Sequence, residues 1–266
     1  MGPRRRPRRR AATGHPRPVR HHAAAPRPGL LIRAEEYPVS GGGQAPPADV
    51  TAALRDVADL GGFFVLRVGG PDAGWQPLGH SYARGFTDLA DAVARRHRAP
   101  EARIGVSIAQ LGHAARLWSP ALACLLLHGI VPDLARLERA VDGPALRLPR
   151  PAGVDAGRLP SPARALYAQV TGHLDALAAG LRVKVAPRLL DGNSASALVE
   201  AARALLAARP TLREPLTALT TELLGTGRLV GTGDITGPEL TFRRRSCCLY
   251  YRAPEGSNCG DCCLAR

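Results

Sequence analysis

Apolar residues recur three or four positions apart over most of the chain, as they do on one face of an α-helix. This spacing is clearest over 86–97 and 104–118, and it returns over 166–177 and 198–205. A last helix is expected over 214–224. Short apolar or alternating runs indicate only a few strands. The pattern therefore predicts a mostly α (α+β) protein, a helical domain with a few short strands.

Capping residues predict where two of the helices begin. Asp49 can cap a helix that runs to about Leu60. Ser161-Pro162 offers a cap followed by proline at the first helical position, and that helix is expected to continue to Gly180.

Breaking residues predict where helices stop. Ser119-Pro120 should end the helix over 104–118, so that the apolar run Ala121–Ile130 forms a separate, buried helix. Asp191-Gly192-Asn193 is interpreted as a turn, and the Pro- and Gly-rich stretch Pro144–Pro162 as an internal linker.

The expected strands are short and scattered. Phe63–Val68 is apolar and lies between glycines, and Leu146–Leu148 is a second candidate. Leu181–Val185 alternates like a strand but could equally be the end of a helix. The glycine-rich stretch Gly225–Gly233 lacks the spacing of a phosphate-binding loop and is interpreted as a hinge or hairpin.

The net charge of +14 is concentrated at the two ends of the chain. Residues 1–29 hold nine arginines, no acid and almost no apolar content, which predicts a disordered arm. Residues 243–266 hold five arginines against two acids. The predicted organisation is an Arg/Pro-rich arm over 1–29, a mainly helical domain over 30–240 and a cysteine-bearing segment over 241–266. A nearly neutral body with basic ends is not the pattern of a uniformly basic nucleic-acid binder.

Neither a secretory signal nor a membrane span is expected. The arginines of the arm are not followed by the apolar stretch that a signal peptide needs. The longest uncharged run, Leu117–Pro132, is 16 residues and contains a proline, whereas a spanning helix needs about 20 apolar residues. The expected location is the cytoplasm.

Five of the six cysteines lie in the last 20 residues, in the arrangement Cys-Cys-x10-Cys-x2-Cys-Cys. A disulfide framework would spread its cysteines so that bridges close long loops, and adjacent cysteines pair with difficulty. Clustered thiols in such a chain are more typical of metal ligands. Tyr250 and Tyr251 lie beside them and could shield such a site from water. Spacing alone leaves an iron–sulfur cluster, a zinc site and unligated thiols open.

The residues around the cysteines favour one of these three kinds of site. Arg244-Arg245-Ser246-Cys247-Cys248-Leu249-Tyr250-Tyr251-Arg252, followed by Cys259-Gly260-Asp261-Cys262, resembles the C-terminal motif of the ferric-siderophore reductase (FhuF-like) family. Two upstream stretches are similar to segments of that family: ARLWSP at 115–120 and RLLDGNSASAL at 188–198, with Asp191 where tryptophan is usual. Residues 1–29 match nothing in it.

The resemblance implies a [2Fe–2S] cluster bound by four cysteines, which are Cys247, Cys248, Cys259 and Cys262. It also implies one-electron reduction of siderophore-bound ferric iron in the cytoplasm. The partners would be a ferric siderophore and a separate electron donor, a ferredoxin or a flavoprotein reductase, because no nicotinamide or flavin fingerprint is visible. No nucleic acid is expected, and a peripheral membrane association stays open. Arg84, Arg116 and Arg243–Arg245 are cationic candidates for contact with an anionic chelate.

Two other classes of function stay open from the residues. One is a binding module, with or without a nucleic-acid-binding arm, whose tail is stabilised by zinc. The other is a siderophore-biosynthesis or chelate-binding domain whose cluster is structural or acts as a sensor. Cys263 and Cys124 are interpreted as packing residues. The histidines show no paired metal spacing and are interpreted as structural.

Deleting residues 2–29 should leave the thermal midpoint and the visible spectrum unchanged, because this arm offers almost nothing to bury. Differential scanning fluorimetry and absorption spectra of the two chain lengths test this. Loss of visible absorption in the shorter chain would show that the arm is part of the fold.

Overall fold

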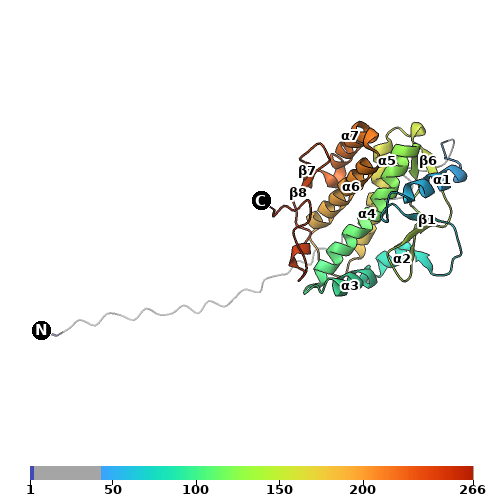
Figure 1. The fold of residues 1–266 in the computed structure, drawn as a ribbon. Coiled ribbons are helices and arrows are strands. Elements are labelled where there is room, and N and C mark those ends of the chain that lie inside the picture. Colours follow the sequence, from blue (N-terminus) through green and yellow to red (C-terminus); the bar gives the residue numbers. More distant parts are fainter. Residues whose placement is uncertain (3–42, 266) are drawn as a thin grey trace. The chain divides into compact units, whose positions relative to one another are not determined.

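The structure, a computed structural model, describes residues 1–2 and 43–265 (Figure 1). Most of the predicted arm and the predicted start of the helical domain lie outside the described residues. Within them the mostly α fold is confirmed. The helices are α1 Pro47–Ala58, α2 Leu78–Ala83, α3 Thr87–Arg96, α4 Ala102–His128, α5 Pro162–Gly180, α6 Pro187–Ala208 and α7 Arg213–Leu224, with short 3-10 turns η1 Ala156–Arg158, η2 Pro210–Leu212, η3 Gly227–Leu229 and η4 Tyr250–Arg252.

Short strands form three small sheets. The first has the order β1-β5-β4-β2, in which β1 and β5 are parallel and the other pairs are antiparallel. The second pairs β3 with β6 and the third pairs β7 with β8, both antiparallel. Their bounds are β1 Leu66–Val68, β2 Trp75–Pro77, β3 Ile130–Pro132, β4 Glu138–Ala140, β5 Leu146–Leu148, β6 Gly153–Asp155, β7 Gly233–Ile235 and β8 Phe242–Arg244.

Helix α4 runs through the middle of the described fold, where it packs against α1, α3, α5 and α6 (Figure 1). Its partner over the longest stretch is α6, which lies beside it. Trp118, Leu122 and Ala123 of α4 are completely buried in this core. Because α4 is apolar on most sides over its second half, it can be covered by helices from several directions.

The break predicted at Ser119-Pro120 is wrong, because α4 continues through Pro120 to His128. Proline removes one helical hydrogen bond and costs about 3 kcal/mol in a helix interior. Each fully buried large side chain contributes about 1.5–3 kcal/mol, and Trp118 and Leu122 flank the proline. Burial of both faces therefore outweighs the local penalty. The apolar run Ala121–Ile130 is buried only over its first four residues and at Ile130, because residues 125–127 are half-buried and His128 is exposed. It forms the second half of α4 and the start of β3 rather than a separate helix.

Two predicted helix starts also differ from the structure. Helix α1 begins at Pro47, no side chain caps it, and Asp49 lies in its first turn. Asp191-Gly192-Asn193 is not a turn but lies inside α6. The start of α5 is confirmed, since the Ser161 Oγ accepts a hydrogen bond from the Arg164 amide at 3.2 Å.

The strand predictions are confirmed only in part. Phe63 and Phe64 belong to a turn, in which the Phe64 amide donates to the Gly61 carbonyl at 2.9 Å, and β1 starts only at Leu66. The stretch Pro144–Pro162 is not a linker, because its strand β5 is buried between β1 and β4. Leu181–Val185 forms neither strand nor helix.

Two buried arginines organise the four-stranded sheet. Arg147 is 1% exposed, lies 4.9 Å from the ring centre of Trp75, and pairs with Glu138 at 2.5 Å and Asp72 at 3.0 Å. Arg139 is equally buried and pairs with Asp88 at 2.5 Å. Each buried guanidinium thus has a carboxylate partner, which is what a charge in the interior requires.

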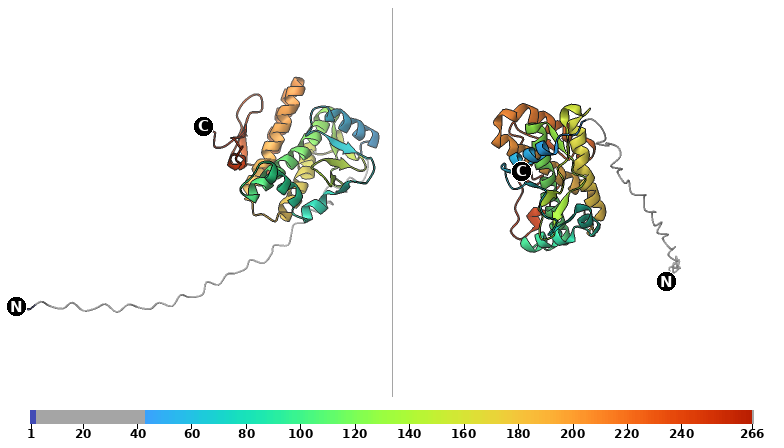
Figure 2. Two further views of the ribbon diagram at one scale, coloured as in Figure 1. Left: turned by 60° about the horizontal axis from the view of Figure 1, so that its bottom comes forward. Right: turned by 90° about the vertical axis from the view of Figure 1, so that its right-hand side faces the viewer.

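The cysteine segment, residues 242–264, begins with β8 and lies against α6 and the start of α4 (Figure 2). Strand β8 pairs with β7 across the predicted boundary at residue 240. Gly192 of α6 makes the close approach possible, since a Cβ built there would lie 2.1 Å from the Ser246 Oγ. The segment therefore packs directly on the backbone of α6.

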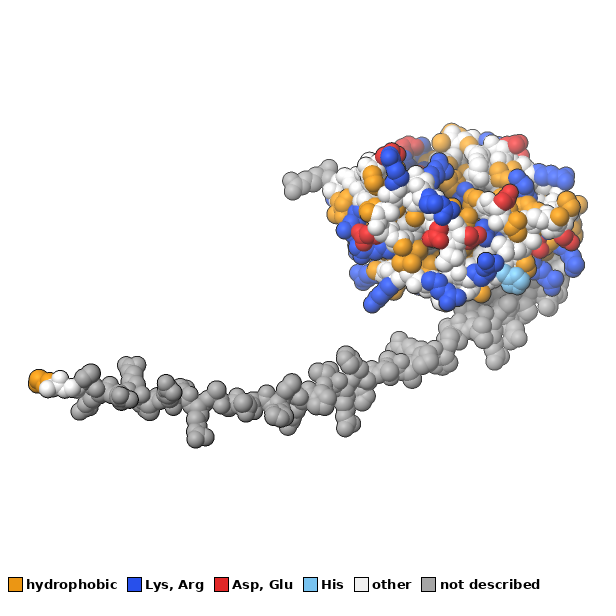
Figure 3. Space-filling view, turned by 90° about the horizontal axis from the view of Figure 1, so that it is seen from below, with side chains coloured by type: hydrophobic (Ala, Val, Ile, Leu, Met, Phe, Trp, Pro, Cys, Tyr) orange, Lys and Arg blue, Asp and Glu red, His pale blue; other side chains and the backbone are white. Residues whose placement is uncertain are grey.

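The described surface mixes charges of both signs. On the face seen from below, Arg and Lys side chains are spread out, with acidic and hydrophobic side chains between them (Figure 3). None of the helices in residues 43–265 has the length and apolar character that crossing a bilayer would require.

We expect Gly192→Ala to loosen the cysteine segment, because the added methyl group overlaps Ser246. Overpacking of this kind costs about 1–3 kcal/mol. The matched control is Gly172→Ala in α5, where a Cβ meets nothing within 4 Å, and which should gain up to about 1 kcal/mol from its better helix propensity. Urea unfolding and limited proteolysis of both variants test this. Equal stability of the two variants would contradict the packing described here.

Candidate metal centre

The thiols of the cysteine segment lie in one short stretch and form no disulfide. Cys248 and Cys262 are buried, while Cys247, Cys259 and Cys263 are half-buried. The Sγ atoms of Cys248 and Cys259 lie 3.6 Å apart. Two sulfurs bound to one tetrahedral ion through bonds of about 2.3 Å, the length found at zinc, are separated by about 3.8 Å. This pair therefore already has the spacing of two ligands on one metal.

Proximity changes the acidity of this pair. The hydrogen bond between the two sulfurs lowers the pKa of Cys248 and raises the pKa of Cys259. The nearby charge of Arg244 adds a smaller lowering of the pKa at both sulfurs. A thiolate at Cys248 is the form that binds metal.

Backbone amides donate to two of the four predicted ligands in one repeated pattern. The Leu249 amide donates to Cys247 Sγ at 3.3 Å, and the Leu264 amide donates to Cys262 Sγ at 3.3 Å. In each case the donor lies two residues after the cysteine. Such N–H···S hydrogen bonds stabilise thiolates and tune the metal that they hold.

The backbone directly after the adjacent cysteines has an unusual conformation. Leu249 has a φ of 68°, in the left-handed region that a leucine rarely adopts. Such strain costs about 1–3 kcal/mol and is typical of functional sites. Gly256 lies so close to the chain that a Cβ there would be 1.9 Å from the Tyr250 carbonyl oxygen. The turn after the vicinal pair is therefore specified by both residues.

A buried hydrogen-bond network attaches the cysteine segment to α4 and α6. The Ser107 Oγ donates to the Cys248 carbonyl at 2.7 Å. The Asn193 Nδ2 donates to the Ser107 carbonyl at 3.0 Å and to the Gln110 Oε1 at 2.9 Å. Asn193, Ser107 and Gln110 are all buried. The carbonyl of one predicted ligand is thus held by a polar cluster inside the helical core.

Arg244 joins this network from β8. It is 1% exposed, its terminal NH2 donates to the Asn193 Oδ1 at 2.7 Å, and its amide donates to the Asp261 carbonyl at 3.1 Å. The Asp261 carboxylate in turn accepts a hydrogen bond from the Ser196 hydroxyl of α6. Arg244 therefore lies between the stretch that carries Cys247 and Cys248 and the turn that carries Cys262.

The other arginines proposed for an anionic chelate have different positions. Arg243 and Arg245 are exposed, and Arg245 pairs with Asp234 at 3.0 Å. Arg116 packs over the ring of Phe63 at 4.9 Å from its centre. Arg84 is exposed. The structure thus divides the Arg243–Arg245 run into one buried arginine and two exposed ones.

The remaining cysteines and tyrosines are less closely involved. Cys124 is 1% exposed in α4, and burial raises the pKa of its thiol to about 12, in keeping with a packing role. Tyr250 is half-buried and places its ring edge-on against His97 at 5.5 Å, whereas Tyr251 is exposed. Only the first tyrosine thus covers part of the segment.

Two histidines without any spacing signal meet in the core away from the cysteines. The Tyr82 hydroxyl lies 2.7 Å from His113 Nε2 and 3.3 Å from His173 Nδ1. His173 Nε2 is 2.8 Å from the Leu134 carbonyl oxygen. Burial lowers the pKa of His113 to about 3, so it is neutral in the folded protein. These contacts fit the structural role expected of the histidines.

The upstream stretches singled out by sequence meet at the α4–α6 contact. Trp118 Nε1 in the first stretch donates to the Ser194 Oγ in the second at 3.1 Å. The second stretch also supplies Gly192, Asn193 and Ser196, all of which contact the cysteine segment. These stretches therefore build the support of the cysteines. Ser107 and Gln110, which complete that support, carry no signal in the sequence, whereas Asp261 lies within the cysteine motif.

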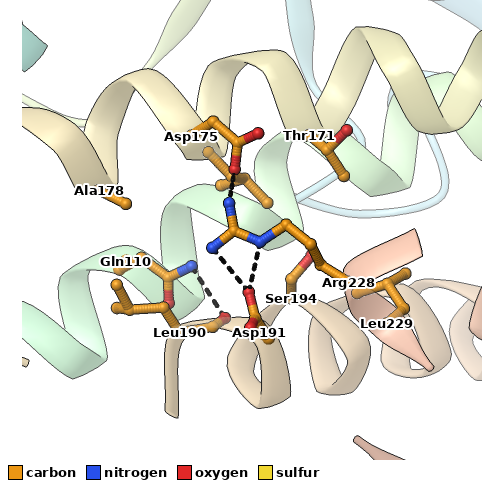
Figure 4. A pocket seen from close by; sticks show the side chains of 10 residues that line it. Gln110, Thr171, Asp175, Ala178, Leu190, Asp191, Ser194, Arg228 and Leu229 are labelled. Carbon is orange, nitrogen blue, oxygen red and sulfur yellow. Dashed lines mark hydrogen bonds and ion pairs between the residues drawn. The ribbon is translucent and has the colours of Figure 1, made fainter. Parts of the chain in front are cut away.

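Asp191, the departure from the family pattern, lines a pocket between α5, α6 and η3 (Figure 4). Arg228 donates from its Nε to Asp191 at 3.0 Å and also pairs with Asp175 across the pocket. Burial raises the pKa of Asp191. Gln110 also lines this pocket and accepts a hydrogen bond from Asn193. The pocket therefore adjoins the hydrogen-bond network that supports the cysteine segment.

The donor set fits an iron–sulfur cluster. Within residues 43–265, no three His, Cys, Asp or Glu side chains are arranged to hold one ion, so the structure brings Cys248 and Cys259 together but does not group all four predicted ligands. Backbone amides donate to two further sulfurs, those of Cys247 and Cys262. The buried Nε of Arg244 has no hydrogen-bond partner among the described residues. An all-thiolate site with N–H donors and a buried cation suits an anionic cluster that is bound by four cysteines.

Comparison with known proteins agrees with this chemistry. A protein-family model, the FhuF 2Fe-2S C-terminal domain, matches residues 244–264. No curated protein and no solved structure matches the chain. The match covers the stretch from Arg244 to the end of the cysteine motif. Residues 244–264 are therefore an FhuF 2Fe-2S C-terminal domain, which confirms the resemblance to the FhuF-like family over this segment and indicates that the chain binds a [2Fe–2S] cluster.

Proposed function

We propose that the protein is a ferric-siderophore reductase, which passes one electron at a time to siderophore-bound ferric iron and releases it as ferrous iron. The observation that carries this proposal is the FhuF 2Fe-2S C-terminal domain anchored on a buried polar network of α4 and α6. When bound, a [2Fe–2S] cluster supplies single electrons, which is what reduction of Fe3+ to Fe2+ requires.

The proposed ligands are Cys247, Cys248, Cys259 and Cys262. Amide hydrogen bonds to the first and last of these sulfurs support the assignment, as does the short distance between Cys248 and Cys259. Cys263 lies directly after the fourth ligand, and we assign it no ligand role.

The chelate sets the energetic demand on the reaction. A siderophore binds Fe3+ more tightly than Fe2+, and each tenfold preference lowers the potential of the bound iron by about 59 mV. Iron–sulfur potentials span about −700 to +450 mV, so a sufficiently reducing value is accessible. After reduction the chelate binds its iron more weakly, and the ferrous ion leaves. We propose that the reaction takes place in the cytoplasm and that a separate ferredoxin or flavoprotein reductase supplies the electrons.

Replacing each proposed ligand by serine in turn should abolish or sharply reduce cluster content, because a serine hydroxyl is a poor ligand for iron that needs thiolates. Iron and acid-labile sulfide per chain, measured after anaerobic purification, give the result. Cys263→Ser is the matched control within the same segment, and it should retain full cluster content. Bleaching by the control variant, together with retention in any of the four, would overturn the assignment.

Ferric siderophores should reoxidise the dithionite-reduced protein while Fe2+ appears. Anaerobic stopped-flow absorption with a series of hydroxamate and catecholate chelates measures the rate, which should fall as the preference for Fe3+ rises. A ferrous chelator should accelerate net reduction of the harder substrates, because it removes the product. A reduced protein that stays reduced with every chelate and a ferrous trap would exclude the reductase and leave a structural or sensory cluster. A colourless protein that contains zinc would exclude both.

A further inference from the structure

Among the described residues, Arg244 is the buried arginine of the cysteine segment. Its surroundings leave one of its nitrogen atoms without a hydrogen-bond partner. Among the buried side-chain nitrogen and oxygen atoms of residues 43–265, only its Nε lacks a hydrogen-bond partner. An unpaired N–H of a charged group in the interior is costly, so native proteins rarely leave one. Such an atom requires a hydrogen-bond partner that the described residues do not provide.

The rest of the side chain is held in place. The terminal NH2 donates to the Asn193 Oδ1 at 2.7 Å, and the amide of the same residue is bonded to the Asp261 carbonyl at 3.1 Å. A Cβ on Gly192 would lie 3.1 Å from this NH2, so the helix backbone closes one side. The guanidinium therefore cannot swing out to solvent without breaking the polar core.

The positive charge of Arg244 also has no counterion within the described part of the chain. No carboxylate among the described residues forms an ion pair with Arg244, whereas Arg139 and Arg147 each have one. Its charge acts on the thiols of Cys248 and Cys259. A buried cation without an anion is strongly unfavourable unless an anionic group is bound beside it.

We propose that Arg244 sets the reduction potential of the cluster, with its Nε–H donating a hydrogen bond to a sulfur of the cluster site and its charge stabilising the reduced form. The proposal rests on the ligand assignment made above. Asn193 acts as a positioning residue, because it holds the guanidinium through its carbonyl oxygen and α4 through its amide. One-electron reduction adds a negative charge to the site, and a fixed buried cation favours that state.

The first experiment compares two neighbouring arginines. Arg244→Gln and Arg245→Gln remove the same formal charge one residue apart, but Arg245 is exposed and paired with Asp234 at the surface. In EPR-monitored redox titrations of the intact protein, we expect Arg244→Gln to disfavour the reduced form at least tenfold, a fall of about 59 mV in midpoint potential. Arg245→Gln should change it much less. Equal potentials in both variants and the native protein would overturn the proposal.

A second variant covers the case in which Arg244→Gln fails to fold. Asn193→Asp keeps the shape of the side chain and places a carboxylate next to the guanidinium, which offsets its charge, but it removes the amide hydrogen bonds to Ser107 and Gln110, so its folding is checked first by thermal unfolding. We expect this variant to lower the midpoint potential in the same direction. A potential that is unchanged or raised in a well-loaded Asn193→Asp protein would count against the charge of Arg244 as the cause.

A spectroscopic measurement tests the hydrogen bond on the native protein itself. Protein grown with arginine that is 15N-labelled at Nε should show a weakly coupled 15N nucleus in pulsed EPR of the reduced cluster. The signal should vanish in Arg244→Lys and persist in Arg245→Lys. Its absence from the native protein would overturn the hydrogen bond.

The outcomes separate this inference from the proposed function. A native protein without iron and sulfide would refute the ligand assignment, and with it the basis of the inference. A loaded protein that reduces ferric chelates, but whose potential and 15N coupling do not depend on Arg244, would refute the inference alone.

Discussion

One buried amide connects the parts of the protein on which the cysteines depend. Asn193 is completely buried, so its two N–H donors and its carbonyl oxygen must all find partners inside the protein. The donors reach Ser107 and Gln110 of α4, and the oxygen accepts from Arg244 of β8. Leaving one such group unpaired costs about 1–3 kcal/mol, so α4, α6 and β8 have a single favourable arrangement. The position of the cysteine segment follows from that arrangement.

The buried arginines of this protein fall into two kinds. Arg139 and Arg147 are neutralised by carboxylates and belong to the four-stranded sheet, where they hold loops and strands together. Arg244 has polar partners but no carboxylate partner among the described residues, and its charge acts on the thiols of Cys248 and Cys259. The two kinds therefore have different roles. Arg139 and Arg147, paired with carboxylates, stabilise the fold, whereas the charge of Arg244 is available to an anionic group.

Local features of this structure could be predicted from sequence and long-range ones could not. The cysteine motif, the start of α5 at Ser161 and the extent of α7 depend on residues close together in the chain, and these predictions agree with the structure or with the family match. Pro120 was misleading because its local penalty is outweighed by packing that involves distant helices. The roles of Ser107 and Asn193 depend on a contact across 86 positions, which no spacing rule reveals.

The two sides of the contact between Ser107 and Cys248 are synthesised at different times. The two residues are 141 positions apart, and the helices that bear Ser107 and Asn193 leave the ribosome before any cysteine of the segment. N-terminal parts of a chain generally fold first during synthesis. The thiols therefore emerge onto a surface whose hydrogen-bonding groups are already in place. Cofactor insertion can then follow the completion of the helical core, and a chain that stalls before β8 carries the receiving surface but none of the ligands.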